Sequence, residues 1–157
     1  MNTCLRNTAY EIVLDTNIFP EFIDRRAQYE QVCQLIDSIH DGKYDAFIST
    51  GCIYILSFLF ERSLKRQDIH RPELTKRLRG YLAEVLNMAT VVDLPHAGVE
   101  SAVYNEAFTD IEDSFQYQCA LENDCDVLIT INIDDYKDAD QSQLEILTPS
   151  AFANKYM

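Results

Sequence analysis

The chain has 157 residues, 47% of them hydrophobic, and its 26 acidic and 13 basic residues give a formal net charge of −13. This length suffices for one domain with a hydrophobic core, and the scarcity of glycine and proline, four of each, excludes a long flexible linker. The negative charge excludes nucleic-acid binding through the whole surface, because such binding depends on basic residues that neutralise phosphates.

The cysteines and apolar stretches give no sign of secretion or of a membrane anchor. The five cysteines form no C-x-x-C pair and, with three scattered histidines, make no zinc-binding pattern. The longest apolar run, residues 53–60, is much shorter than the roughly 20 residues that a transmembrane helix needs. We therefore expect a cytoplasmic protein with reduced, mostly buried thiols and no contact with a membrane.

The hydrophobic pattern predicts strands that alternate with helices. The predicted strands are 12–14, 46–49, 90–92, 127–130 and 144–147. The predicted helices are 21–39 in two pieces, one from 51 through 60, 72–86, 97–108, 113–121 and a short one from Pro149. Such alternation indicates a parallel sheet with helices on both faces. The expected fold is therefore a three-layer α/β/α sandwich with a mainly parallel sheet of about five strands, in one domain spanning 1–157.

The first predicted strand runs directly into Asp15, Thr16 and Asn17. Asp15 either caps the helix that follows or lies in the ligand crevice that parallel strands form at their carboxyl ends. An apolar strand that leads straight to an acid favours the second interpretation, in which Asp15 binds a metal ion.

Asp110 and Asp113 lie three residues apart at the start of a predicted helix. The spacing is close to that of a capping box, and the helix dipole favours acids there. The apolar residues after Asp113 place its turn near the sheet. For Asp113, a role in capping the helix and a role in a functional site are therefore equally supported. Capping is the favoured interpretation of Asp110.

The strand at 127–130 is followed by Asn132, Asp134 and Asp135. Turn chemistry alone accounts for such residues. If these acids meet Asp15 and Asp113 at one crevice, however, their carboxylates repel one another unless a cation neutralises them. Mg²⁺ or Mn²⁺, which prefer hard oxygen ligands, are the cofactors expected there.

In chain order, these elements resemble a PIN domain, a family of metal-dependent nucleases that includes many bacterial toxin ribonucleases. The resemblance covers most of the chain and rests on I-V-L-D-T-N at 12–17, D-I-E-D at 110–113, the strand and turn at 128–136, and I-L-T-P at 146–149. It implies an endoribonuclease that cuts single-stranded RNA with Mg²⁺ or Mn²⁺, pairs as a homodimer and is a toxin held inactive by an antitoxin.

The resemblance also implies roles for individual residues. Asp15, Asp113 and Asp135 would be the catalytic residues and metal ligands. Four further residues would support them: Asn17, Asp110, Thr130 and Asn132.

The chain departs from the family pattern at two places. The family usually has an acid about six residues beyond a serine like Ser49, whereas this chain reads G-C-I-Y-I-L at 51–56, and Glu61 comes too late to replace that acid. Ile131 also stands where a basic residue is common. The missing acid leaves two alternatives open: a degenerate RNA-binding module without activity, and an interaction protein whose acidic surface binds a basic partner.

Seven of the thirteen basic residues lie between positions 62 and 79. They either hold an RNA backbone beside the crevice, with Arg62, Lys65 and Arg66 as candidate contacts, or form a solvated helix face with pairs such as Glu73 and Arg77. Two nearby tyrosines are more simply explained as core residues than as base-stacking platforms: Tyr54 and Tyr81.

Overall fold

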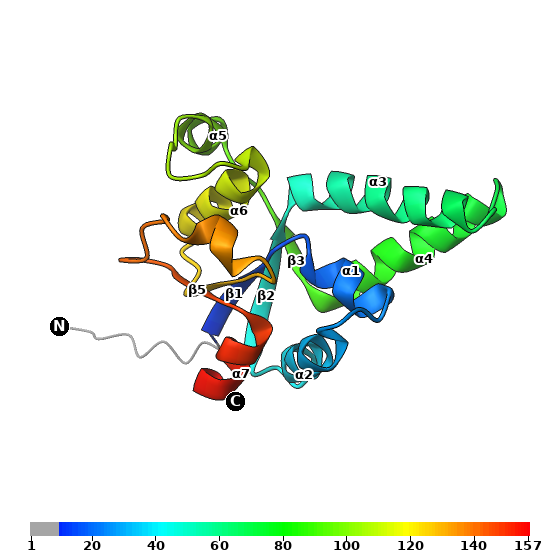
Figure 1. Cartoon of the computed structure of the whole chain (residues 1–157), viewed down its shortest axis with the longest axis horizontal. Coiled ribbons are helices and arrows are strands. Elements are labelled where there is room, and N and C mark those ends of the chain that lie inside the picture. Colours follow the sequence, from blue (N-terminus) through cyan, green and yellow to red (C-terminus); the bar gives the residue numbers. More distant parts are fainter. Residues whose placement is uncertain (1–9) are drawn as a thin grey trace.

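The computed structural model describes residues 10–157 and contains a central sheet of five parallel strands (Figure 1). The strands lie in the order β3-β2-β1-β4-β5, and their bounds are β1 (Tyr10–Leu14), β2 (Tyr44–Ser49), β3 (Thr90–Val92), β4 (Val127–Ile129) and β5 (Glu145–Leu147). In the central strand, Val13 is in register with Phe47 of β2 and Leu128 of β4. The predicted α/β/α sandwich with a mainly parallel five-stranded sheet is confirmed.

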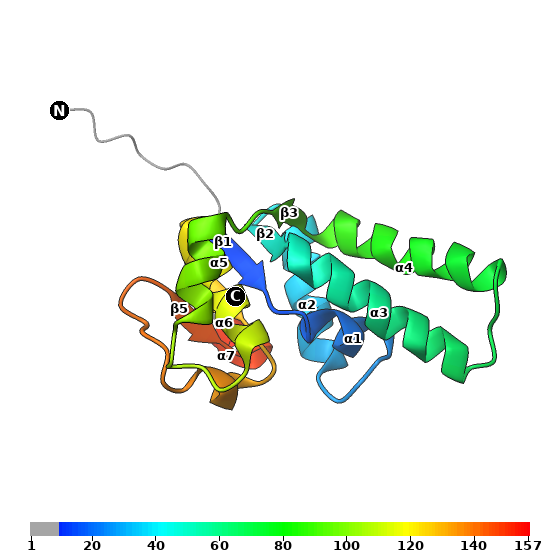
Figure 2. The ribbon, with the colours of Figure 1, turned by 90° about the horizontal axis from the view of Figure 1, so that it is seen from above.

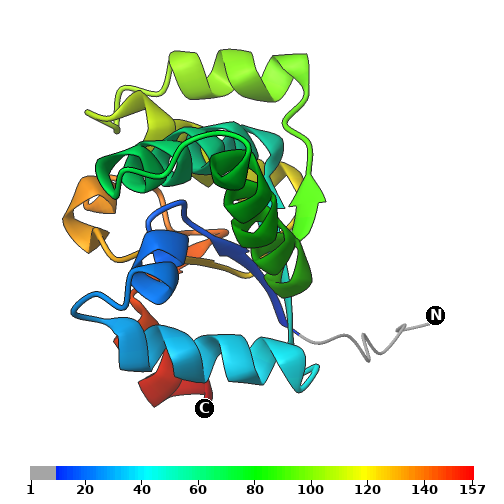
Figure 3. The same ribbon diagram turned by 90° about the vertical axis from the view of Figure 1, so that its right-hand side faces the viewer.

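Helices cover both faces of this sheet (Figures 1 and 3). Their bounds are α1 (Ile18–Ile23), α2 (Tyr29–His40), α3 (Thr50–Arg66), α4 (Glu73–Met88), α5 (His96–Val103), α6 (Ile111–Glu122) and α7 (Pro149–Tyr156), with a 3-10 turn η1 (Ile133–Tyr136). The helices α2 and α7 lie on one face, and α6 lies on the other with α5 outside it. Figure 2 shows that α3 and α4 run side by side and project away from the sheet.

The central strand β1 is buried on both faces. Ile12 and Leu14 belong to the core on the side of α2, whereas Val13 packs with Leu128 and Tyr117 on the side of α6. Successive side chains of a strand point to opposite faces, so a strand covered on both sides must be apolar at every position. This double burial fixes the end of β1, and with it the position of Asp15.

Two sequence predictions about local structure are wrong. The helix predicted at 97–108 ends at Val103, because the Asn105 side chain accepts a hydrogen bond from the Ala107 N–H at 3.1 Å and stabilises a turn. Tyr54 is 75% exposed. The residue two positions before it and the residue two positions after it in α3 face the core, so Tyr54 points the opposite way, to the surface.

The free cysteines are buried at positions 52, 119 and 125 and half-buried at Cys33, while Cys4 lies outside the described residues. Burial raises the pKa of the Cys52 thiol to about 12. Within residues 10–157, no helix combines the length and the apolar character required to cross a bilayer.

Candidate metal and active site

A cavity of about 260 Å³ lies at the carboxyl ends of β1 and β4, between the first turn of α6 and the turn η1. The strand order changes direction at β1, because β2 and β3 lie on one side of it and β4 and β5 on the other. In open parallel sheets the ligand crevice forms at such a point, beyond the carboxyl ends of the strands. Five carboxylates and one guanidinium, that of Arg26, line the cavity; the acids are Asp15, Asp110, Glu112, Asp113 and Asp135.

Asp15 lies at the floor of this cavity and is 2% exposed. Its Oδ1 accepts a hydrogen bond from the Thr16 N–H at 2.7 Å, and its Oδ2 accepts one from the Thr130 hydroxyl at 2.7 Å. The Asn17 amide also donates to Oδ2 at 3.2 Å. Asn17 does not use its side chain to cap α1. The predicted supporting residues Asn17 and Thr130 therefore hold the carboxylate of Asp15.

Tyr136, which the sequence analysis missed, joins the two buried acids. Its hydroxyl oxygen lies 3.1 Å from Asp15 Oδ2 and 3.4 Å from Asp113 Oδ1, and the residue is 1% exposed. A phenol has a single hydrogen to donate, so it satisfies one of these oxygens at a time. The remaining oxygen, Asp113 Oδ2, is buried and has no hydrogen-bond partner among residues 10–157.

The environment raises the pKa of both buried acids. Burial raises the pKa of Asp15 to about 6, against the opposing effect of its hydrogen bonds from Thr130 and Tyr136. Burial and the neighbouring carboxylates of Asp15, Asp110 and Asp135 raise the pKa of Asp113 to about 7. Near neutral pH this cavity therefore favours protons or a cation over bare negative charge.

The other predicted site residues line the rim of the cavity. Asp110 is the N-cap of α6, since its Oδ1 accepts a hydrogen bond from the Glu112 N–H at 2.9 Å. Asp135 is exposed on η1. Asn132 is also exposed, and its N–H donates to Thr130 Oγ1 at 3.1 Å. All three side chains line the same cavity as Asp15 and Asp113.

The cavity supplies the donor set of a hard divalent cation. Carboxylate and amide oxygens are the ligands that Mg²⁺ and Mn²⁺ prefer, and the unpartnered Asp113 Oδ2 offers a buried oxygen to such an ion. In the described part of the chain, no three His, Cys, Asp or Glu side chains are close enough together to hold a metal ion as they stand. An ion held by Asp15 and Asp113 would complete its coordination with water, and the exposed carboxylate of Asp135 would become a third ligand only by turning inward.

Ile55 occupies the position where the family pattern has an acid. Its side chain lines the acidic cavity from α3. The cavity wall on that side is thus apolar. The acid that the family usually has, and that this chain lacks, would lie in the wall of the candidate site.

A second polar network, also missed, crosses the sheet edge beside Asp15. The Gln116 amide donates to Thr16 Oγ1 at 3.1 Å, and the Ser49 hydroxyl donates to Gln116 Oε1 at 3.3 Å. Ser49 in turn caps α3 by accepting a hydrogen bond from the Cys52 N–H at 3.1 Å. The only sequence signal was that Gln116 follows Asp113 by three residues, which places both on one face of a helix.

The basic run divides between two surroundings. Lys65 pairs with Glu61 at 2.7 Å, and the predicted pair of Glu73 with Arg77 forms at 2.8 Å. Arg62 and Arg66 instead line a hollow next to the acidic cavity. The structure thus separates the three basic residues that the sequence analysis grouped as RNA contacts.

Comparison with known proteins gives matches over most of the chain. Ribonuclease VapC1 of Aquifex aeolicus (strain VF5) is 22% identical over 151 residues, which cover 93% of this chain and 95% of that protein. VapBC2 from Rickettsia felis, solved bound to a promoter DNA fragment, aligns with a TM-score of 0.62 at 14% identity and covers 88% of this chain and 98% of that one.

Two further solved structures share the fold. FitAB bound to the IR36 DNA fragment aligns with a TM-score of 0.62 at 17% identity and covers 88% of this chain and 94% of that one. The sarcin-ricin loop cleaving toxin VapC20 of Mycobacterium tuberculosis aligns with a TM-score of 0.54 at 15% identity, covering 74% of this chain and 86% of that one.

The sequence profile of the PIN domain matches residues 11–134, which is well over half of the chain. This range includes Asp15, all of β1 but its first residue, the first turn of α6 with Asp113, and β4, and it ends within the turn η1, one residue before Asp135. It agrees with the resemblance seen in the motifs. The chain belongs to the PIN domain family.

Proposed function

We propose that this protein is an endoribonuclease that cuts single-stranded RNA with Mg²⁺ or Mn²⁺, and that it is the toxin of a toxin–antitoxin pair. The observation that carries the proposal is the meeting of Asp15 and Asp113 at Tyr136, with Asp113 Oδ2 buried and unpartnered in a cavity of five carboxylates. Membership of the PIN family and similarity to a protein named ribonuclease VapC1 support it.

In this proposal Asp15, Asp113 and Asp135 hold the cation. A bound ion would polarise the phosphodiester and lower the pKa of an attacking water. Asp15 is kept in place by Thr130 and Asn17, whose donors occupy its Oδ2. Asp135 is exposed at the rim, where it can orient an entering water.

Two further residues support the acids in the proposal. Asp110 fixes the first turn of α6, and so the position of Asp113, by capping the helix. Asn132 lies at the opposite rim, where its amide can hydrogen-bond a ligand of the ion.

The test is metal titration by calorimetry together with cleavage of a labelled single-stranded RNA, in wild type, Asp15→Asn and Asp113→Asn. We expect both substitutions to abolish Mn²⁺ and Mg²⁺ binding and cleavage. Asp45→Asn, which removes the charge of an exposed acid on β2, is the matched control and should behave as wild type. Cleavage that survives in Asp15→Asn would show that the activity does not come from this site.

A second candidate, an RNA-binding module without activity, is favoured by one observation. Ile55 lines the cavity where the family has an acid, so the cavity has one charged ligand fewer. RNA binding that weakens with salt, without cleavage in Mn²⁺, would establish this alternative.

The partners follow from charge and from the comparisons. The solved VapBC2 and FitAB structures contain assemblies bound to DNA fragments, and a net charge of −13 suits a basic protein such as an antitoxin. We further propose that residues 1–157 form a single domain, that the protein is cytoplasmic and that it pairs as a homodimer, which light scattering on the purified chain would measure. Co-purification with a basic protein, without RNA affinity or cleavage, would instead indicate an interaction protein.

A further inference from the structure

One face of α3 connects three adjoining hollows into a groove, named here the α3 groove. The acidic cavity shares Leu59 and Arg26 with a hollow of about 310 Å³ on one side, and shares Ile55 and Glu112 with a hollow of about 410 Å³ on the other. Eight residues of α3 line the three hollows: Thr50, Gly51, Ile55, Leu59, Phe60, Arg62, Ser63 and Arg66. Five of them follow one another at spacings of three or four residues: Gly51, Ile55, Leu59, Arg62 and Arg66. At about 100° per residue these positions fall within about 80° of the helix circumference, so they form one continuous strip.

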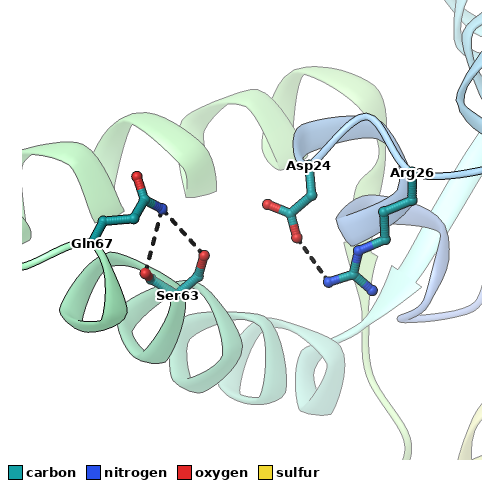
Figure 4. A network of polar contacts seen from close by, with 4 residues as sticks. All are labelled: Asp24, Arg26, Ser63 and Gln67. Carbon is teal, nitrogen blue, oxygen red and sulfur yellow. Dashed lines mark hydrogen bonds and ion pairs between the residues drawn. The ribbon is translucent and has the colours of Figure 1, made fainter.

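The hollow beyond Leu59 is basic. Arg26, Arg62 and Arg66 line it together with one acid, Asp24. Asp24 is already paired with Arg26 at 2.8 Å, and Figure 4 shows this pair beside the contact between Ser63 and Gln67 on α3.

Arg62 and Arg66 have no ion-pair partner among residues 10–157, unlike Lys65 on the adjacent face of the same helix. The Arg62 guanidinium lies over the Phe58 ring, 5.8 Å from its centre, a cation–π contact that leaves the N–H groups of the guanidinium without an anionic partner. Two unpaired guanidiniums in one hollow are suited to a polyanion.

The hollow beyond Ile55 is apolar inside and acidic at its edge. Ile55, Leu94, Val99 and Phe115 line it, and the Thr50 hydroxyl donates to Asp93 Oδ1 at 3.0 Å at the rim. An aromatic ring in an apolar pocket offers a stacking surface for a nucleobase. The carboxylates of Asp93 and Glu112, which also line it, accept hydrogen bonds from exocyclic amino groups.

We propose that the α3 groove binds a single RNA strand across the acidic cavity, with phosphates on Arg62 and Arg66 at one end and an amino-bearing base in the apolar hollow at the other. The inference rests on the proposed function and deepens it, because it names how the substrate is held. From Ile55 to Arg66 the helix rises about 16 Å, which matches about five stacked nucleotides at 3.4 Å each. An RNA is the favoured occupant because a strand of phosphates complements the unpaired arginines, whereas its base needs the apolar end.

The basic end is tested by fluorescence anisotropy with a labelled ten-nucleotide RNA in EDTA, where cleavage cannot occur. We expect Arg62→Ala and Arg66→Ala each to weaken binding about tenfold and to lower the salt slope of the affinity by about 0.7, the value for one phosphate of a single strand. Arg26→Ala should cost less, because Arg26 is already paired with Asp24. Lys43→Ala, which removes a charge from the loop before β2, should leave both quantities unchanged.

Lys65→Ala distinguishes RNA binding in the α3 groove from a general attraction of RNA to the basic residues of α3. Because Lys65 lies outside the hollow and is paired with Glu61, its loss should cost much less affinity than the loss of Arg66. Equal losses in all four variants would overturn the groove in favour of a diffuse basic surface. Unchanged affinity in every arginine variant would overturn it too, and would assign the groove to a segment of a protein partner.

The apolar end is tested with Val99→Trp, which narrows the hollow from α5 without touching the arginines. Wild type should bind an oligocytidine more tightly than an oligouridine, because cytosine carries an exocyclic amino group, and Val99→Trp should remove this preference. Val103→Trp, an exposed position one turn later in α5, is the control and should retain it. Equal affinity of wild type for the two RNAs would contradict base recognition in this hollow.

The two proposals can fail separately. If the protein does not cleave RNA in Mn²⁺ but the arginine variants lose binding, the nuclease assignment fails and the groove stands. If it cleaves RNA and the arginine variants bind and cleave as wild type does, the groove fails and the nuclease assignment stands.

Discussion

Tyr136 is a positioning residue for the two buried acids, because its hydroxyl is the only side-chain group in residues 10–157 within hydrogen-bond distance of both Asp15 and Asp113. Tyr136→Phe removes this donor and leaves the ring packed edge-on against Phe108. Loss of such a supporting contact typically costs about 10- to 100-fold in metal affinity. We expect a loss of this order in Mn²⁺ binding by calorimetry.

The matched control for Tyr136 is Tyr117→Phe. Tyr117 also packs against Phe108, but its hydroxyl donates to the Asp140 carbonyl oxygen at 2.7 Å and contacts neither acid. An equal loss of Mn²⁺ affinity in both variants would mean that the effect comes from the stability of this face of the core.

Ile55 is the residue at which the family acid can be restored. Ile55→Glu adds a carboxylate to the cavity wall, so we expect tighter Mn²⁺ binding, by roughly tenfold, and a less stable metal-free protein because another negative charge joins the five present. Tyr54→Glu adds the same charge at an exposed neighbouring position and should alter neither. If Ile55→Glu leaves Mn²⁺ affinity unchanged, position 55 does not contribute to the metal site.

At the scale of single residues, the sequence predicted the acids and two of the residues that hold Asp15, Asn17 and Thr130, but not the tyrosine that joins Asp15 to Asp113. Asp15 and Asp113 were found because each lies at a boundary between apolar and polar positions, a pattern visible in one dimension. Tyr136, Gln116 and Arg26 had no such signal, because their contacts depend on how η1, α6 and the loop after α1 meet in space. Local sequence patterns carry no information about contacts between segments that are distant in the chain.

At the scale of elements, the first turn of α6 combines a structural and an electrostatic role. Asp110 caps the helix, but its charge also raises the pKa of Asp113. Asn is as good a cap as Asp and has no charge, whereas Ala cannot cap. We therefore expect Asp110→Ala to have a free energy of unfolding about 1 kcal/mol lower than Asp110→Asn in urea denaturation. Equal stabilities of the two variants would show that the cap contributes nothing.

The elements themselves were predicted more reliably than their ends. All five strands and the order of the helices follow from the hydrophobic periodicity, because each element buries a continuous face. The predicted helix at 97–108 was too long, since the side chain of Asn105 ends it through a local hydrogen bond that periodicity ignores. The exposed Tyr54 shows the same limit, because an apolar run does not reveal which face lacks a neighbour.

For the whole molecule, the buried acids predict how stability depends on pH. The pKa values of Asp15 and Asp113 are raised from 3.8 to about 6 and about 7, so the folded protein binds protons that the unfolded chain releases. Their stabilising contribution is complete below about pH 4 and is lost as the pH rises to about 7. In EDTA, we expect these two acids to lower the melting temperature progressively across this range.

Mg²⁺ should reverse this loss, because it binds the ionised carboxylates and stabilises the folded state that holds it. The difference in melting temperature between Mg²⁺ and EDTA should therefore grow from about pH 5 to about pH 8. Asp113→Asn, which cannot ionise, should flatten the curve in EDTA and reduce the effect of Mg²⁺. If the difference in melting temperature between Mg²⁺ and EDTA does not vary with pH, the stabilisation by Mg²⁺ does not depend on the ionisation of these acids.

Both edge strands of the sheet, β3 and β5, contain only three residues. A strand this short presents few free N–H and C=O groups, and short edges are a way in which proteins avoid joining sheet to sheet. The sheet is open at two sides, yet neither side is a good template for another chain. We therefore expect any association between copies of this protein to use its helices, among them the face of α3 that exposes Tyr54 and Phe58.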